Sequence, residues 1–311
     1  MKFAIFAAGG VGGYFGGRLA QAGHDVTFIA RGTHLAAIRE AGLKVDSIDG
    51  NFFVQPAKAT DDPASVGVVD VLLVAVKAWQ LEVAIKQMKL LVGMNTVILP
   101  LLNGVEAPEQ LSAAFGGECV LGGLCRVSSF VAGPGHIQHV GIQPIIVLGE
   151  LDNHRTERVE AIRGALSSIY NSTVEIAEDI QVALWEKFLI VCALSGVGAV
   201  TRQPVGVYRD VPETRAMLTR AIEETAAVGR ARGVPLSRGV VARVLDRVDF
   251  IQPDVIASMH KDIVEGRPSE LEAQNGAVMR MGRELSVLTP AHDFIYASLL
   301  PLELRARSKI D

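Results

Sequence analysis

The sequence has few cysteines, few aromatic residues and no excess of charge of one sign. Of its 311 residues, 5% are aromatic, and the three cysteines are Cys119, Cys125 and Cys192. An odd number of cysteines without paired spacing argues against a disulfide framework and a zinc site, and it predicts a reducing, cytoplasmic compartment. A net charge of −4 offers no basic surface to nucleic acid or to an anionic membrane.

Long hydrophobic runs are also scarce. The uncharged stretch 188–200 contains Ser195, Gly196 and Gly198. It is short for a membrane span and typical of a buried core helix. The histidines show no metal-ligand spacing, so we predict no metal site.

The first half of the sequence alternates apolar strands with helical patterns. We predict strands at 2–7, 24–30, 69–76 and 95–100, helices at 11–22, 33–41 and 78–90, and a hairpin over 43–55 about Asp49-Gly50. The strand at 69–76 is apolar throughout, as expected when helices cover both faces of a parallel sheet. The pattern therefore predicts a Rossmann-type, doubly wound sheet.

The alternation of strands and helices ends after residue 118. Three β-rich runs (119–131, 136–140 and 144–149) are expected as antiparallel additions to the sheet edge, followed by a helix at 155–169 and a strand at 172–177. Beyond Glu178 the pattern is helical, with helices expected at 179–195, 212–232, 236–249, 254–265, 269–284 and 291–305. We therefore predict an α/β fold with a nucleotide-binding domain at 1–177. An all-helical substrate or dimerisation domain follows at 178–311, an arrangement like that of 6-phosphogluconate dehydrogenase.

A glycine-rich segment, AAGGVG at residues 7–12, follows the first predicted strand and opens the first helix. The dinucleotide fingerprint G-x-G-x-x-G occupies the same place, but Ala7 stands at its first glycine position. Gly9 would let the backbone approach a pyrophosphate at the helix N-terminus, and Gly12 would let the helix pack close to the strand. The predicted cofactor-binding residues here are Gly9, Gly10, Val11 and Gly12. A purely structural glycine-rich turn is the alternative.

Arg31 follows the second predicted strand, where an enzyme that uses NAD usually carries Asp or Glu for the ribose 2′-hydroxyl. A guanidinium suits a 2′-phosphate instead, so the sequence favours NADP (NADPH) over NAD. A solvated loop arginine is the alternative reading of this single residue.

Two polar residues follow the next two strands of the predicted sheet. Lys77 comes directly after the strand at 69–76, and Asn103 comes shortly after the strand at 95–100. In open α/β sheets, ligands bind beyond the carboxyl ends of the strands, so both side chains are predicted to face a ligand. An ordinary polar strand end and a turn dipeptide are the respective alternatives.

Together these motifs resemble those of the 2-dehydropantoate 2-reductases, also called ketopantoate reductases. The resemblance covers nearly the whole chain and is carried by GGVGGYFGGRLAQAGHDVTFIARG (9–32), VKAWQ (76–80), LNGV (102–105), WEKF (185–188), SMHKDIVEGRPSELEAQNGAVMRMGREL (258–285) and VLTP (287–290). It implies an enzyme that reduces 2-dehydropantoate to (R)-pantoate with NADPH, in pantothenate biosynthesis.

The resemblance also implies roles for individual residues. Lys187 matches the general acid that protonates the carbonyl oxygen. Ser258 matches a residue on the substrate, and Glu270 matches one beside the cofactor and the lysine. Asn103 and Lys77 match residues that contact cofactor and substrate. The alternatives are a solvated lysine, a first-turn helix charge for Glu270 and an ordinary helix residue for Ser258.

Two positions on the helix of Lys187 depart from the family. The family has substrate-binding asparagines four and eight positions after the lysine, but this chain has Val191 and Ser195. Helical spacing puts both on the face of Lys187, so we expect that face to line the substrate site. The reaction type is thus better supported than the substrate. A reductase of a different 2-keto acid and a non-catalytic NADP-binding regulatory protein are the alternatives.

Lys187 heads the apolar run 188–200. We expect these surroundings to disfavour its charged form and so to make it a better acid. A capping box formed by Ser269 and Glu272 is expected to place Glu270 in the first turn of its helix, where its charge would offset the cost. The expected partner is a small-molecule 2-keto acid, without nucleic acid or membrane. The oligomeric state, a homodimer included, is left open.

Overall fold

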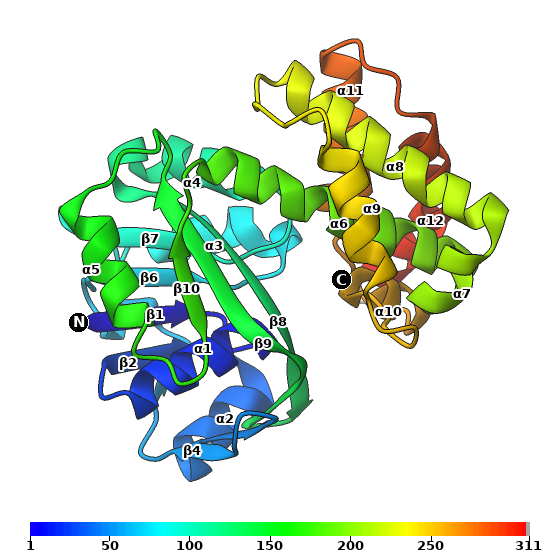
Figure 1. The fold of residues 1–311 in the computed structure, drawn as a ribbon. Helices are drawn as coiled ribbons and strands as arrows, with labels where there is room; N and C mark the ends of the chain where they lie inside the picture. Colours follow the sequence, from blue (N-terminus) through cyan, green and yellow to red (C-terminus); the bar gives the residue numbers. More distant parts are fainter. Residues whose placement is uncertain (309–311) are drawn as a thin grey trace. The chain divides into compact units, whose positions relative to one another are not determined.

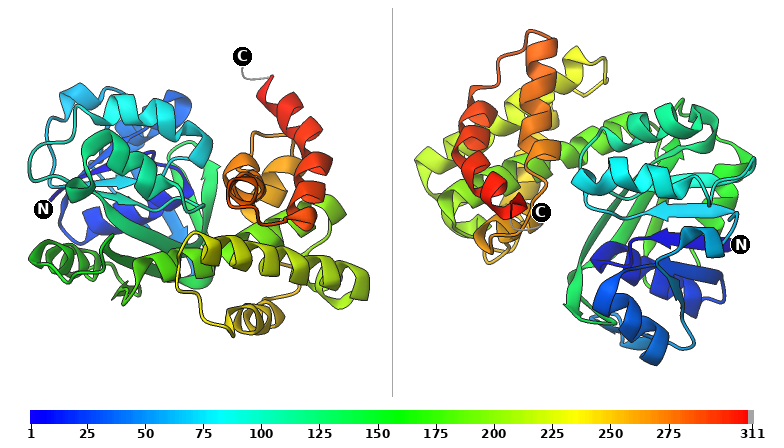
Figure 2. Two further views of the ribbon diagram at one scale, coloured as in Figure 1. Left: turned by 90° about the horizontal axis from the view of Figure 1, so that it is seen from above. Right: turned by 180° about the vertical axis from the view of Figure 1, so that it is seen from behind.

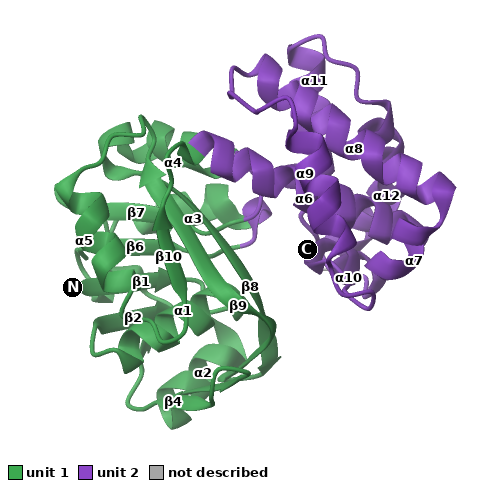
Figure 3. Ribbon diagram, in the orientation of Figure 1, with its two compact units in different colours: residues 1–76, 80–102, 106–180 green, residues 77–79, 103–105, 181–311 purple. Residues whose placement is uncertain are grey.

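The computed structural model describes residues 1–308. They form two compact units, each with a hydrophobic core of its own (Figures 1 and 3). Unit 1 comprises residues 1–76, 80–102 and 106–180, and unit 2 comprises residues 77–79, 103–105 and 181–311. The short segments after two strands of the first unit therefore group with the second unit.

Unit 1 is built on a sheet of five parallel strands. Their order is β5 (Lys58–Thr60), β2 (Asp25–Ile29), β1 (Lys2–Phe6), β6 (Val71–Val74) and β7 (Val97–Pro100). The chain starts at the central strand, moves outward on one side and then returns to the other side. This reversal puts a topological switch point between β1 and β6, as predicted for a doubly wound sheet.

Helices cover both faces of this sheet. On one face lie α1 (Gly10–Gln21) and α2 (Gly32–Ala41), and on the other lie α3 (Leu81–Met88) and α4 (Ala107–Phe115). The alternation of β1 explains the division: Phe3 and Ile5 pack with the first pair of helices, whereas Ala4 and Phe6 pack with the second pair. Short 3₁₀ turns are present at η1 (Pro63–Ser65), η2 (Ala78–Gln80) and η3 (Gly117–Cys119).

A second sheet lies on the far side of α1, and here the sequence prediction was wrong. The β-rich runs form two long antiparallel strands, β8 (Leu121–Gly133) and β9 (His136–Glu150). They do not continue the parallel sheet but form a separate one. β8 pairs along one edge of β9, and the other edge of β9 pairs with β3 (Leu43–Ser47) and with β10 (Thr173–Ile176). The predicted hairpin is present as β3 and β4 (Phe52–Val54). Helix α1 contacts both sheets, and α5 (Glu157–Leu166) packs against β9 and β10.

Unit 2 is helical, as expected from its sequence. Its helices are α6 (Ile180–Thr201, from Gln181 onward in this unit), α7 (Val205–Asp210), α8 (Pro212–Ala231), α9 (Val240–Asp249), α10 (Ser258–Val264), the π-helical turn η4 (Glu272–Gly276), α11 (Ala277–Glu284) and α12 (Pro290–Arg307). Figure 2 shows them from two further sides. By length and composition α6 could cross a membrane, but 67% of its apolar window is buried. Its Leu189, Cys192 and Val197 lie in the core of unit 2.

One predicted helix of unit 2 differs in detail. Residues 269–284 were expected as a single α-helix opened by a capping box, but the π turn η4 precedes α11. The capping box is absent, because Ser269 donates from both its backbone nitrogen and its hydroxyl to Glu303. The carboxylate of Glu272 instead accepts hydrogen bonds from Tyr296 and Arg280. Tertiary partners have thus replaced the reciprocal bond of the capping box, although the Ser269 hydroxyl still accepts a local hydrogen bond from Leu271 N.

Candidate functional site

The loop from β1 to α1 lies at the carboxyl end of the central strand, beside the switch point. Ala7, at the position of the first fingerprint glycine, has φ of +80°. This left-handed region favours glycine and costs a residue with a Cβ about 1–2 kcal/mol. The backbone at this position is therefore of the kind that the glycine of the fingerprint adopts more freely than alanine.

The three glycines after Ala7 have different surroundings. A Cβ on Gly12 would lie 2.0 Å from the Ala7 carbonyl oxygen, and a Cβ on Gly10 would lie 2.3 Å from the Ser129 carbonyl oxygen of β8. Both glycines are thus required by packing within unit 1. A Cβ on Gly9 would have no atom within 4 Å. Only the Gly9 backbone is therefore open to the approach of a ligand.

The first turn of α1 is suited to an anion. Gly9 is the N-cap residue and provides no side-chain cap, and the first backbone bond runs from Gly13 N to Gly9 O at 2.6 Å. Backbone N–H groups at an uncapped helix N-terminus, together with the helix dipole, favour a phosphate. The predicted residues Gly9, Gly10, Val11 and Gly12 all lie in this turn, which could hold the pyrophosphate of a dinucleotide.

Arg31 is the N-cap residue of α2, directly after β2, and its side chain is exposed. Its Nη2 donates to Oε1 of Gln87 on α3 at 2.7 Å. The nearby His34 accepts at Nδ1 from Gly135 N (3.1 Å), which leaves Nε2 to donate to Ala8 O (2.9 Å). His34 thus has a structural role, joining the glycine-rich loop to the turn between β8 and β9.

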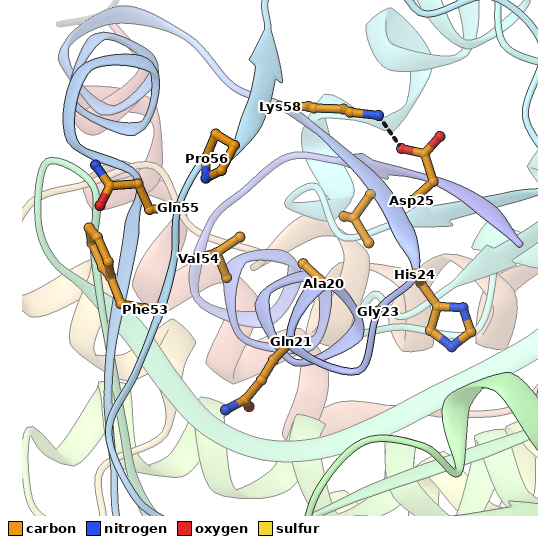
Figure 4. Close-up of a pocket in the computed structure, with 11 residues that line it drawn as sticks. Ala20, Gln21, Gly23, His24, Asp25, Phe53, Val54, Gln55, Pro56 and Lys58 are labelled. Carbon is orange, nitrogen blue, oxygen red and sulfur yellow. Dashed lines mark hydrogen bonds and ion pairs between the residues drawn. The ribbon is translucent and has the colours of Figure 1, made fainter.

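Figure 4 shows a surface pocket of unit 1, and none of its lining residues belongs to the glycine-rich loop. Its lining includes Gly23, His24, Pro56 and the ion pair of Lys58 with Asp25 (2.7 Å). Gly23 and His24 precede β2, so the pocket is at the amino end of that strand. Ligands of open α/β sheets bind at the opposite, carboxyl ends, so we do not assign the cofactor to this pocket.

A buried carboxylate organises the predicted residues of unit 2. Glu270 is 2% exposed. It accepts hydrogen bonds from Asn103 Nδ2 at 3.0 Å and from Ala78 N at 3.2 Å. The segments that follow β6 and β7 therefore meet at one carboxylate, and the structure brings Asn103 and Glu270 together.

Lys77 contacts a second buried carboxylate, which sequence reasoning missed. Its Nζ lies 2.8 Å from Oδ2 of Asp262, a residue 7% exposed. Arg267 donates to the other oxygen of Asp262 at 2.7 Å. Asp262 stands four residues after Ser258, on the same face of α10, and that spacing was the available signal. Ser258 itself is exposed at the start of α10 and, within residues 1–308, forms no hydrogen bond with Glu270 or Asp262.

Lys187, Val191 and Ser195 lie on one face of α6 by helical spacing. Lys187 and Val191 are half-buried, and Ser195 is buried. Trp185 and Phe188 pack into the core with their rings edge to face, 5.6 Å between centroids.

Histidine clusters offer no alternative site. Across residues 1–308, no group of three His, Cys, Asp or Glu side chains is placed to hold a metal ion. Buried His139, His260 and His292 have roles in packing and hydrogen bonding, such as the bond of His139 Nδ1 with the Ser47 hydroxyl at 2.8 Å.

Comparison with known proteins assigns the chain to a family. The family model for ketopantoate reductase PanE/ApbA matches residues 3–153, and its C-terminal model matches residues 179–303. An uncharacterized oxidoreductase of Bacillus subtilis is 33% identical over 299 residues, covering 96% of this chain and 98% of the relative.

Solved structures give the same result. A PanE/ApbA family ketopantoate reductase from Ralstonia eutropha superposes with a TM-score of 0.90 at 31% identity, covering 99% of this chain and all of that one. A D-mandelate dehydrogenase solved with NADH and anilino(oxo)acetate shares the fold, with a TM-score of 0.90 at 22% identity over 99% of this chain and 100% of the other. The protein therefore belongs to the ketopantoate reductase family and is an oxidoreductase that uses a pyridine nucleotide.

Proposed function

We propose that this protein reduces a 2-keto acid to the 2-hydroxy acid with NADPH, and that 2-dehydropantoate is its first candidate substrate. Unit 1 would bind the nucleotide through the α1 N-terminus, and unit 2 would supply the residues that act on the substrate. The observation that carries the proposal is the buried Glu270 carboxylate, held by Asn103 and the Ala78 backbone. Burying a carboxylate costs free energy even when two donors hydrogen-bond to it, so a buried carboxylate held in this way favours a functional role.

Lys187 would act as the general acid. When bound, NADPH would supply the hydride for the carbonyl carbon, so the site has to accommodate negative charge on the carbonyl oxygen. The Lys187 ammonium would stabilise that charge and donate its proton to the oxygen. Its place at the head of the apolar segment of α6 would limit competing water on one side. The uncharged lysine would then regain a proton from solvent after release of the product.

Glu270 and Asn103 would orient the reacting groups. Because Asn103 Nδ2 donates to Glu270 Oε2, its amide oxygen faces the other way and can accept a hydrogen bond from the substrate or from the cofactor. Glu270 would offset the charge of Lys187 and hold Asn103 in one orientation. Lys77, paired with Asp262, would lie beside the phosphate or carboxylate groups of the ligands.

NADPH is proposed over NADH because of Arg31. Its exposed guanidinium follows β2, where the ribose 2′ position is recognised in doubly wound folds. Arg31→Ala should raise the Kd for NADPH about tenfold or more and change the Kd for NADH little, because a charge-assisted bond to phosphate contributes roughly 1.5–3 kcal/mol. Fluorescence titration with both nucleotides measures this, and equal losses would remove the argument for phosphate recognition.

The substrate is the finer part of the proposal. Val191 cannot hydrogen-bond and Ser195 is buried, so the α6 face is more apolar than one bearing two asparagines. A bulkier or aromatic 2-keto acid is therefore the second candidate. NADPH oxidation should be followed with 2-dehydropantoate, branched-chain 2-keto acids and an aryl 2-keto acid. The highest kcat/KM with 2-dehydropantoate would support it as the substrate. Binding of NADPH without turnover of any keto acid would contradict the proposal that the protein is a 2-keto acid reductase.

A further inference from the structure

Glu303, on α12, is a buried carboxylate beside the loop that carries Glu270. It is 4% exposed. Its Oε2 accepts hydrogen bonds from Ser269 N at 3.0 Å and from Ser269 Oγ at 2.6 Å. Ser269 Oγ in turn accepts from Leu271 N at 3.2 Å. The residues on both sides of Glu270 are thus fixed, directly or through one hydroxyl, by Glu303.

Arg307, one turn further along α12, joins the same cluster. Its Nη2 lies 2.7 Å from Glu303 Oε1 and donates to Ser269 O at 3.3 Å. Its guanidinium carbon lies 5.2 Å from the centre of the Trp79 ring, within reach of a cation–π contact. Trp79 follows Ala78, whose backbone nitrogen donates to Glu270. Helix α12 therefore contacts both the loop that carries Glu270 and the 77–79 segment that donates to it.

We propose that Glu303 and Arg307 are positioning residues for Glu270. This inference rests on the proposed function, in which Glu270 acts at the reaction site. Glu303 holds the Ser269–Leu271 backbone from one side, and Arg307 holds the 77–79 segment from the other. Because a displacement of about 1 Å at a catalytic group can cost roughly 10²-fold in rate, a cluster that touches neither ligand can still set the turnover number.

The chain offers a matched control in unit 1. Glu150 is 5% exposed, accepts a hydrogen bond from the Thr156 hydroxyl at 2.5 Å and pairs with Arg158 at 2.5 Å. Like Glu303, it is a buried carboxylate with one hydroxyl and one arginine as partners. None of its side-chain hydrogen bonds and ion pairs within residues 1–308 involves a predicted site residue. A loss of stability that follows from altering any buried carboxylate will therefore appear in variants of both Glu150 and Glu303. A loss of kcat that comes from positioning Glu270 will appear only in the Glu303 variant.

The experiment compares Glu303→Gln and Arg307→Ala with Glu150→Gln in the full chain. Gln at 303 keeps the shape but loses the charge that holds Ser269 and Arg307. We expect each α12 variant to lower kcat about tenfold or more while leaving the Kd for NADPH within about twofold. Glu150→Gln should lower the melting temperature comparably and leave kcat near wild type. Ser269→Ala provides a milder disruption if Glu303→Gln does not fold.

A double-mutant cycle with Glu270→Ala separates positioning from general damage. If Glu303 acts through Glu270, adding Glu303→Gln to Glu270→Ala should change kcat by less than about twofold. Additive losses, or an unchanged kcat in the folded Glu303→Gln and Ser269→Ala proteins, would overturn the inference. A wild-type protein without keto acid reduction would instead count against the proposed function, so the two failures are distinguishable.

Discussion

The predicted site residues of the two units use different chemical groups, backbone groups in unit 1 and side chains in unit 2. In unit 1 they are mostly backbone: Gly10 and Gly12 have no room for a Cβ, and Gly9 leaves its peptide open. In unit 2 they are side chains: two donors hold the buried carboxylate of Glu270, and Lys77 pairs with the buried Asp262, which Arg267 also contacts. The first kind of site is damaged by an added atom, and the second kind by a lost partner. Each kind therefore calls for a different kind of variant.

The largest expected effect is in unit 2. Lys187→Ala should lower kcat by roughly 10²–10⁴-fold, the range of a positioned general acid, and should change the Kd for NADPH little. Lys187→Arg keeps the charge but cannot release its proton readily, so it should also be slow. Steady-state kinetics with the best 2-keto acid checks both. An arginine variant with wild-type turnover would mean that charge, not proton donation, is what Lys187 supplies.

The next effect also belongs to unit 2 and concerns pH. Burial lowers the pKa of His292 from 6.5 to about 4, and its ring contacts Thr225 Oγ1 and Asn275 Nδ2. The folded state thus binds this proton less readily than the unfolded state. The free energy of unfolding should fall by roughly 3 kcal/mol as the pH drops from about 6.5 toward 4.

Urea unfolding at several pH values tests this against His292→Gln, which can keep a hydrogen bond but cannot be protonated. Burial raises the pKa of the neighbouring Glu224, whose contribution has the opposite sign and is common to both proteins. The difference between the two proteins therefore isolates the histidine. Parallel pH dependences for wild type and variant would show that His292 does not contribute.

In unit 1 the contrast of neighbouring glycines gives a smaller effect. Gly10→Ala should lower the free energy of unfolding by roughly 1–3 kcal/mol, because its Cβ would meet the Ser129 carbonyl. Gly9→Ala meets no protein atom, so it should fold as wild type and weaken NADPH binding by obstructing the pyrophosphate. Thermal melts and nucleotide titrations of both variants measure this. Unchanged NADPH affinity in Gly9→Ala would place the pyrophosphate elsewhere.

The smallest effect is expected at Ala7. Ala7→Gly removes a Cβ from a backbone with φ of +80°, but it also gives the unfolded chain more freedom. The net gain should be about 1 kcal/mol or less, seen as a slightly higher melting temperature. Nucleotide affinity should be retained or improved. A lower melting temperature in the glycine variant would show that the Ala7 methyl group makes a packing contact worth more than the strain.

Local patterns in the sequence predicted much of the fold. The apolar strand at Val71–Val74, the glycine-rich turn and the hairpin of β3 and β4 each depend on residues close together in the chain. The second sheet was missed because its strands are far apart in the sequence. Lys44 pairs with His136, across 92 residues, and local sequence patterns do not predict the register of such a pairing. The fourth helix of unit 1, α4, and the short α7 were missed as well.

The same limit applies to the site. Glu270, Asn103 and Lys77 were found by resemblance and strand position, but their roles are still proposals. Asp262 was missed because its partner Lys77 is 185 residues away. The capping box was wrong for a related reason: the Ser269 backbone nitrogen donates to Glu303, 34 residues further on, and not to Glu272. The spacing of a motif predicts only hydrogen bonds between residues close together in the sequence. A buried charged side chain from a distant part of the chain can form a stronger hydrogen bond and replace the local one.

The segments at 77–79 and 103–105 limit how this protein can be dissected. Because they group with unit 2, the chain passes between the units at 76/77, 79/80, 102/103, 105/106 and 180/181. A fragment beginning at Gln181 would lack Asn103 and Ala78, and its Glu270 carboxylate would lose both of the donors that hold it. An exchange of the helical half between relatives would likewise have to carry two tripeptides from the other half. In this sense the functional module is not a continuous stretch of the gene.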